Sequence, residues 1–169
     1  MAVRPQEQTA SGDSEAPETG PRKRLGPYGL LTAAYAAGLG LFLWGSRRRL
    51  PRGFSAGDLG LLGVATHKTS RAFAKDKVTA PLRAPFTEHE GSGGPGELEE
   101  SPRGSGLRHV IGELLVCPYC LDQWVATGFA AGLVTAPRPT RFVASIMAAV
   151  AISDFLQIAY KASEEQLGT

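Results

Sequence analysis

The sequence predicts an all-α integral membrane protein with three transmembrane helices and one amphipathic helix in the membrane interface. Two observations predict this class. Long apolar runs that are almost free of charge stand at one place near the N-terminus and at two places near the C-terminus. The polar residues are pooled between them, in segments rich in Gly and Pro, which number 21 and 12 of 169 residues. Such segments do not build a core that could bury the apolar runs.

The first predicted transmembrane helix covers residues 25–46. It carries no charge and is bounded by Arg22-Lys23-Arg24 and Arg47-Arg48-Arg49. At about 1.5 Å per residue, a helix of this length spans roughly 30 Å, the thickness of a bilayer core. A cleaved signal peptide is the alternative, but the long charged leader and the three arginines after the run favour an uncleaved span. The tail before it, residues 1–24, is rich in Glu, Ser, Pro and Gly and is predicted to be disordered.

Two more transmembrane helices are predicted near the C-terminus, at about 120–137 and 142–160. The link between them, Arg138-Pro139-Thr140-Arg141, is short, so we expect a tight antiparallel hairpin within residues 107–169. Gly128 and Gly132, four residues apart on the first of these helices, suggest that this helix packs closely against another.

The segments between the spans are predicted to lie at or outside the membrane surface. Within 54–77, only Leu59 to Thr66 is free of charge and His, which is too short to cross, so we expect an amphipathic or partly inserted helix. Residues 78–87 contain two prolines and predict an elbow. Residues 88–106 are Gly- and Glu-rich and predict a disordered linker.

The most specific motif is Cys117-Pro118-Tyr119-Cys120, which contains both cysteines of the chain. Two Cys at this spacing at the start of a helix can close a disulfide, and a helix N-terminus lowers the pKa of the first thiol. The same spacing supplies half of a zinc site, for which His109 is a candidate third ligand. Close packing in a helix elbow is the favoured interpretation, ahead of a redox pair and then of a metal site.

Asp154 is the second candidate, because it interrupts the last apolar run. A charge in mid-membrane costs about 2.5–3.5 kcal/mol on insertion scales, so the side chain must face protein or water. A stripe of small and polar residues lies beside it at Ser145, Ala149, Ser153 and Gln157. We expect interhelical hydrogen bonding; the alternative is a proton or cation site.

Three further polar residues are candidates. Asp76 precedes the elbow at 78–87 and Arg83 lies within it. They form either a solvated charge cluster or a fixed turn in which Arg83 meets a phosphate or an Asp. Glu113, on the amphipathic helix before the Cys motif, could orient a thiol or pair with Arg108.

Partners and cofactors follow from composition. The lipid bilayer is the expected partner, and the Ala/Gly faces, with Gly29, Ala33 and Ala37 on the first span, predict a homo- or hetero-oligomer. A net charge of +2 gives no basic field for nucleic acid. The glycines at 91–96 carry no Lys-Ser/Thr ending, so they do not predict a phosphate loop, and no cofactor is expected.

Two segments together resemble a known family. The first contains Ala65-Thr66-His67-Lys68, Asp76-Lys77-Val78-Thr79 and Leu82-Arg83-Ala84-Pro85-Phe86-Thr87. The second contains Gly112-Glu113-Leu114-Leu115-Val116-Cys117-Pro118-Tyr119-Cys120-Leu121, followed by Trp124-Val125-Ala126. Over about 57–161 this resembles a family of small bacterial multi-pass membrane proteins of unknown function, some of them associated with sporulation. Residues 1–52 look like an addition to the family core, and Asp122 stands where the family has a small residue.

The resemblance implies a bacterial multi-pass membrane protein with no established activity. The leading functional interpretation is a non-enzymatic structural or interaction component of the cell membrane. The first alternative is a membrane thiol-disulfide or thiol-sensing protein that uses Cys117 and Cys120. The second is a small transporter or channel subunit that uses Asp154.

Overall fold

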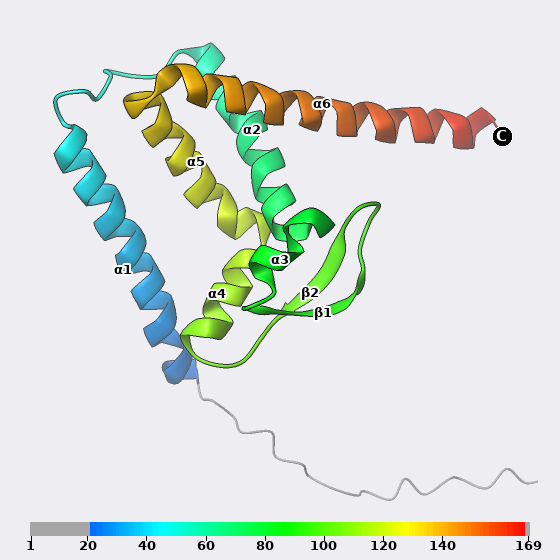
Figure 1. The fold of residues 1–169 in the computed structure, drawn as a ribbon, viewed down its shortest axis with the longest axis horizontal. Coiled ribbons are helices and arrows are strands. Elements are labelled where there is room, and N and C mark those ends of the chain that lie inside the picture. Colours follow the sequence, from blue (N-terminus) through cyan, green and yellow to red (C-terminus); the bar gives the residue numbers. More distant parts are fainter. Residues whose placement is uncertain (1–20, 168–169) are drawn as a thin grey trace, which may run out of the picture.

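The computed structural model describes residues 21–167 and is mostly helical, with one small antiparallel sheet (Figure 1). The prediction of a helical protein is confirmed, and the prediction of an all-α protein is wrong because of the sheet. Of the tail predicted for 1–24, residues 1–20 lie outside the described part, and 21–24 belong to the first helix. The elements are α1 (Pro21–Ser46), α2 (Ala56–Lys75), the 3-10 helix η1 (Lys77–Thr79), α3 (Ala80–Arg83), β1 (Thr87–Ser92), β2 (Leu98–Pro102), α4 (Leu107–Val116), α5 (Pro118–Thr135) and α6 (Pro137–Leu167).

Helix α2 is the central element, packed against both α5 and α6. It begins where the Ser55 hydroxyl accepts a hydrogen bond from the Asp58 N–H at 3.0 Å, which caps the helix. Its buried face is formed mainly by small residues, which let two other helices approach closely: Leu62, Ala65, Thr66, Ser70 and Ala74. A helix was predicted for 54–77, and α2 lies within these bounds, packed between other helices; its place at a membrane interface stays a prediction.

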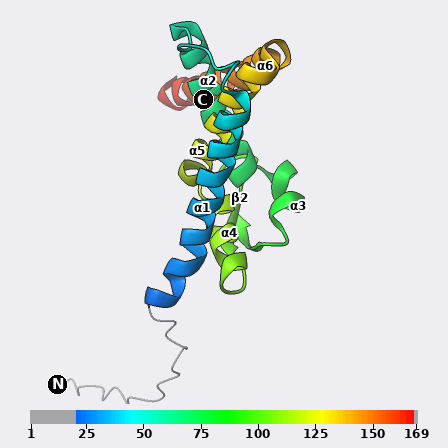
Figure 2. The ribbon, with the colours of Figure 1, turned by 90° about the vertical axis from the view of Figure 1, so that its left-hand side faces the viewer.

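Helices α5 and α6 do not form the predicted antiparallel hairpin. Ala136 alone separates them, and Arg138 to Arg141 lie in the first turns of α6. Pro137 and Pro139 are compatible with this, because the first turn of a helix does not use its N–H groups. Helix α6 therefore runs away from α5 across one end of α2 (Figure 1), and Figure 2 shows it foreshortened while α1 and α5 stand upright.

Two helices of the described chain are long and apolar enough to cross a membrane, Leu25–Ser46 within α1 and Pro137–Gln166 within α6. The first lies near the N-terminus and shares its pattern with a signal helix. Helix α5 is not a third candidate, because its first turns contain Asp122 and Gln123, which leave too short an apolar stretch. The predicted number of spans is therefore reduced from three to two.

The segment 88–106, predicted to be a disordered linker, contains most of a β-hairpin. Strand β1 pairs with β2 from Thr87 opposite Pro102 to Ser92 opposite Leu98, with an irregularity between His89 and Gly91. Its acidic residues, which suggested a solvated linker, form ion pairs instead. These pairs are Arg71–Glu97 at 2.8 Å, Lys75–Glu99 at 3.1 Å and Arg83–Glu100. We refer to residues 71–102, which these pairs hold together, as the polar module.

Arg83 is the centre of the polar module, with a side chain that is 1 % exposed. Its Nε donates to the carboxylate of Glu100, which is 6 % exposed. One terminal nitrogen, Nη1, shares its two hydrogens among three acceptors: the carbonyl oxygen of Phe73 at 2.7 Å, that of Asp76 at 3.2 Å and the hydroxyl oxygen of Thr79 at 2.6 Å. The sequence-based view of Arg83 as part of a solvated cluster is wrong, because the guanidinium is buried and bonds to Glu100 and to carbonyls at the end of α2.

Replacing Arg83 by Met is expected to lower the free energy of unfolding by about 3–5 kcal/mol, because it leaves a buried carboxylate without a partner. The double variant Arg83→Met/Glu100→Leu should recover part of this loss, since it removes that charge. Lys75→Met is the matched control: the Lys75–Glu99 pair is more exposed and is expected to contribute less than about 1 kcal/mol. Unfolding of the detergent-purified protein, followed by circular dichroism, measures all three. Equal losses in Arg83→Met and Lys75→Met would contradict the prediction.

Gly112 of α4 is expected to tolerate no side chain. A Cβ there would lie 2.5 Å from the Phe86 carbonyl oxygen and 3.1 Å from Cα of Pro102. Gly112→Ala should therefore destabilise the fold by about 1–3 kcal/mol through overpacking. Gly63→Ala on α2 is the control, because its Cβ would meet nothing within 4 Å and Ala favours helix. The same unfolding measurement compares them, and a Gly112→Ala variant as stable as Gly63→Ala would refute the close contact.

Candidate functional site

The two cysteines lie at the junction of α4 and α5. Cys117 is the N-cap of α5, and its Sγ accepts a hydrogen bond from the backbone N–H of Cys120 at 3.3 Å. Pro118 occupies the first position of the helix, where a missing N–H costs nothing. Cys117 is half-buried, Cys120 is exposed, and both are free thiols. The capping geometry places the two sulfur atoms on the same side of the first turn, 2.8 Å apart.

The surroundings of Cys120 keep its sulfur protonated. Partial burial, the hydrogen bond to Cys117 and the nearby charges of Cys117 and Glu113 raise the pKa of the Cys120 thiol to about 11. At neutral pH Cys120 is therefore a thiol that donates to the sulfur of Cys117. A disulfide has a sulfur–sulfur distance of about 2.05 Å, so this pair can close with a small movement once an oxidant removes two electrons.

Glu113 of α4 joins this junction to α1. The hydroxyl of Tyr28 donates to its Oε2, and Nε2 of His109 lies 3.5 Å from its Oε1. Glu113 does not pair with Arg108, whose Nε instead donates to the carbonyl of Pro85 at 2.8 Å. The suggestion that Glu113 orients a thiol stays a prediction; its charge acts on Cys120 through space.

The proposed metal ligands do not assemble. Within residues 21–167, no group of three or more His, Cys, Asp and Glu side chains is placed to hold a metal ion. His109 faces Glu113 instead of completing a site with Cys117 and Cys120.

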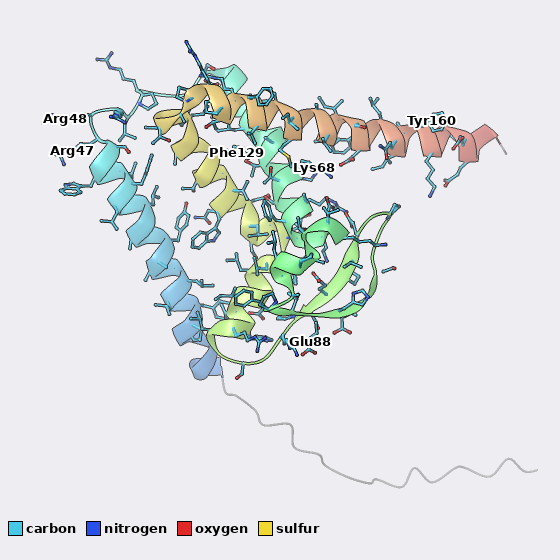
Figure 3. All side chains as sticks on the ribbon, viewed as in Figure 1. Arg47, Arg48, Lys68, Glu88, Phe129 and Tyr160 are labelled. Carbon is cyan, nitrogen blue, oxygen red and sulfur yellow. The ribbon has the colours of Figure 1, made fainter. Side chains whose placement is uncertain are left out.

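Asp154 of α6 meets Lys68 of α2, with 2.9 Å between Oδ2 and Nζ. The same ammonium lies 3.9 Å from Oδ2 of Asp76, so it stands between two carboxylates. Figure 3 shows Lys68 emerging from α2 beneath α6. Sequence reasoning expected Asp154 to contact another helix but did not identify Lys68. An acid in an apolar helix normally pairs with a cation. The presence of Lys68 in the neighbouring helical segment was the feature of the sequence that could have pointed to this pair.

A second ion pair between α2 and α6 was not foreseen. Arg141 donates from Nε to Oδ1 of Asp58 at 2.8 Å and from a terminal nitrogen to Oδ2 at 3.2 Å. These bonds and that from Ser55 lower the pKa of Asp58 to about 2. The sequence analysis placed Arg141 in the link between two helices, whereas it lies in the second turn of α6. Its contact with α2 was therefore not predicted.

The predicted site residues thus fall into three places. Glu113, Cys117 and Cys120 gather with His109 where α4 meets α5. Asp76 and Asp154 flank Lys68, and Arg83 lies in the polar module through its bond to Glu100.

Comparison with known proteins shows the family of this chain. The model of a family described as "Protein of unknown function (DUF1360)" matches residues 61–160. This region contains α2 from Leu61 onward, the polar module, the Cys motif and α6 as far as Tyr160. Helix α1, with Tyr28, lies outside the matched region.

The chain is also similar to a curated bacterial protein. The chain is 28 % identical over 100 residues to the sporulation protein YjcA of Bacillus subtilis (strain 168), covering 57 % of this chain and 85 % of that protein. No solved structure matches the chain. The resemblance stated from the sequence is confirmed: the chain belongs to the DUF1360 family of proteins of unknown function and is distantly related to a Bacillus sporulation protein.

Proposed function

We propose that this protein is a non-enzymatic membrane component that inserts α1 and α6 into lipid and holds the polar module at the membrane surface. The exposure of α6 carries the proposal. Only 17 % of its most apolar stretch is buried within the fold, and none of that of α1. A soluble monomer rarely exposes apolar helices of this length.

The exposed apolar side chains of α6 point in all directions around the helix. A helix that is apolar all round is one that lipid or other helices surround, whereas an interfacial helix has one polar face. The large exposed residues on α6 are Phe142, Val143, Ile146, Val150, Ile152, Phe155, Leu156, Ile158 and Tyr160.

A structural role is supported by what the charged candidates do. The candidates Arg83 and Asp154 each form an ion pair that joins elements of the fold, and Asp58, which was not a candidate, does the same. The predicted small-residue face on α5 offers room for a partner, since a Cβ on Gly128 would meet nothing within 4 Å. Gly132, by contrast, is used within the chain, because its Cβ would lie 2.6 Å from Oγ1 of Thr140.

Cysteine labelling in membranes tests the insertion of α6. In a Cys117→Ser/Cys120→Ser background, Ile152→Cys should resist a water-soluble maleimide in open membrane fragments until detergent is added. Val78→Cys is the control, because Val78 is 85 % exposed within the polar module and should react at once. Mass spectrometry measures both rates. If both positions are labelled at equal rates in the open membrane fragments before detergent is added, α6 is not inserted.

A thiol-disulfide function is the second candidate, favoured by the 2.8 Å between the sulfur atoms of Cys117 and Cys120. Oxidation would form the Cys117–Cys120 bond and release two protons and two electrons. A disulfide of a partner protein would accept the electrons and become two thiols.

Equilibration with glutathione buffers tests this second candidate. A functional pair should close reversibly with a midpoint of about −120 to −270 mV, the range of redox-active disulfides. The raised pKa of Cys120 predicts that alkylation of this residue by iodoacetamide accelerates with pH up to about 11, because only the thiolate reacts. Redox function requires that Cys117→Ser and Cys120→Ser abolish a cellular phenotype equally. If both Cys→Ala variants retain it, the pair serves packing alone.

A further inference from the structure

A cavity of about 600 Å³, lined by both charged and apolar residues, lies between α2, the turn of the β-hairpin and α6. Figure 1 shows the tip of the hairpin between β1 and β2 lying below the C-terminal half of α6. The volume is in the range of sites for small molecules, about 300–1,000 Å³. Its position between the charged polar module and an exposed apolar helix suits a ligand with a charged end.

The charges around the cavity are arranged in a definite order. Arg71 of α2 is neutralised by Glu97, which accepts two hydrogen bonds from it at 2.8 and 3.1 Å. Lys68 carries one positive charge and lies between two carboxylates, those of Asp154 and Asp76. The end of the cavity at Asp154 therefore has a net charge of one negative.

Lys161 supplies the compensating positive charge. It lines the cavity from α6 and makes no ion pair with any residue of the described part of the chain. Asp154 and Lys161 are two helical turns apart on the same face of α6, a separation of about 10 Å along the helix axis. The cavity therefore presents a spare carboxylate charge at one end and a spare ammonium at the other.

The carboxylate end also has an aromatic wall. Phe155 lines the cavity next to Asp154, and its ring stacks on His67 with 6.3 Å between centroids. The side chain of Asp154 is 43 % exposed, so its carboxylate can accept a further donor while it stays paired with Lys68. A carboxylate beside an aromatic ring is a favourable site for an ammonium group.

We propose that this cavity binds a zwitterion in which a primary ammonium is joined to a phosphate or carboxylate, with the ammonium at Asp154 and the anion at Lys161. Side chains of an α-helix lean toward its N-terminus, so the long side chain of Lys161 extends toward Asp154 and shortens the distance that the ligand must span. A primary ammonium is favoured over a quaternary one, because only the former donates hydrogen bonds to Asp154. The ligand is either the headgroup of an ethanolamine phospholipid lying along α6 or a free small molecule of the same chemistry; only the first source depends on the membrane role proposed above.

Native mass spectrometry of the full chain in detergent tests the site with two lipids of identical acyl chains, phosphatidylethanolamine and phosphatidylcholine. In parallel, O-phosphoethanolamine is added without lipid and the unfolding temperature is measured. Asp154→Asn and Lys161→Gln each remove one end of the site. Asp122→Asn and Lys77→Gln are the charge-matched controls, since neither residue lines the cavity.

The expected result is that the wild-type chain retains phosphatidylethanolamine about tenfold more strongly than phosphatidylcholine, and that each site variant loses this preference while the controls keep it. Tenfold is the effect of one charge-assisted hydrogen bond. Stabilisation by O-phosphoethanolamine without a lipid preference would assign the free small molecule, provided both site variants lose it.

The proposal is overturned if the wild type shows neither the lipid preference nor the stabilisation, or if Lys161→Gln behaves like the wild type. Asp154→Asn also breaks the pair with Lys68 and could unfold the chain. Lys161→Gln breaks no ion pair of the described fold, so its result decides in that case.

Discussion

The polar half of this fold depends on the guanidinium of Arg83. A two-stranded hairpin is marginal by itself in water, and this one has few apolar residues to bury. Arg83 compensates by bonding at once to Glu100 of the hairpin and to carbonyls at the end of α2. Because the guanidinium has several donors in a fixed plane, one side chain can fix three segments in a single arrangement. Glu97, which lines the cavity beside α6, belongs to the same hairpin and is held to α2 by Arg71.

Helices α2 and α6 are joined by charge although one is polar and the other apolar. Two ion pairs join them at separate places: Asp58–Arg141 near the N-terminal ends of both helices, and Lys68–Asp154 farther along each helix. Charges on an apolar helix are costly unless a partner neutralises them, so α6 requires α2 beside it. This requirement explains why a helix too polar to cross a membrane by its own composition occupies the centre of the fold.

The Cys junction combines the family core with a segment outside it. Cys117, Cys120 and Glu113 lie in the region that matches the family, whereas Tyr28, which donates to Glu113, comes from α1. Helix α1 also contacts α5 through Tyr35, whose hydroxyl lies 2.8 Å from Oγ1 of Thr127 and whose ring packs edge-on against Trp124. The environment of the thiols in this chain is therefore partly set by a helix that the family core does not include.

Local signals in the sequence were sufficient for the helical class, the apolar stretches of α1 and α6, the break at the Cys motif and the family. Each of these depends on neighbouring residues: uncharged length, the position of Pro118 in a first turn, or a contiguous motif. The hairpin at 87–102, the central position of α2 and the partners of Arg83, Asp154 and Arg141 were not accessible in this way. Glu97 and Glu100 indicate a solvated linker until the cations that neutralise them are brought close by folding. The sequence by itself thus determined which segments are apolar and helical, and the tertiary structure decided which charges meet, because ion pairs form between residues that are distant along the chain and composition does not encode their proximity.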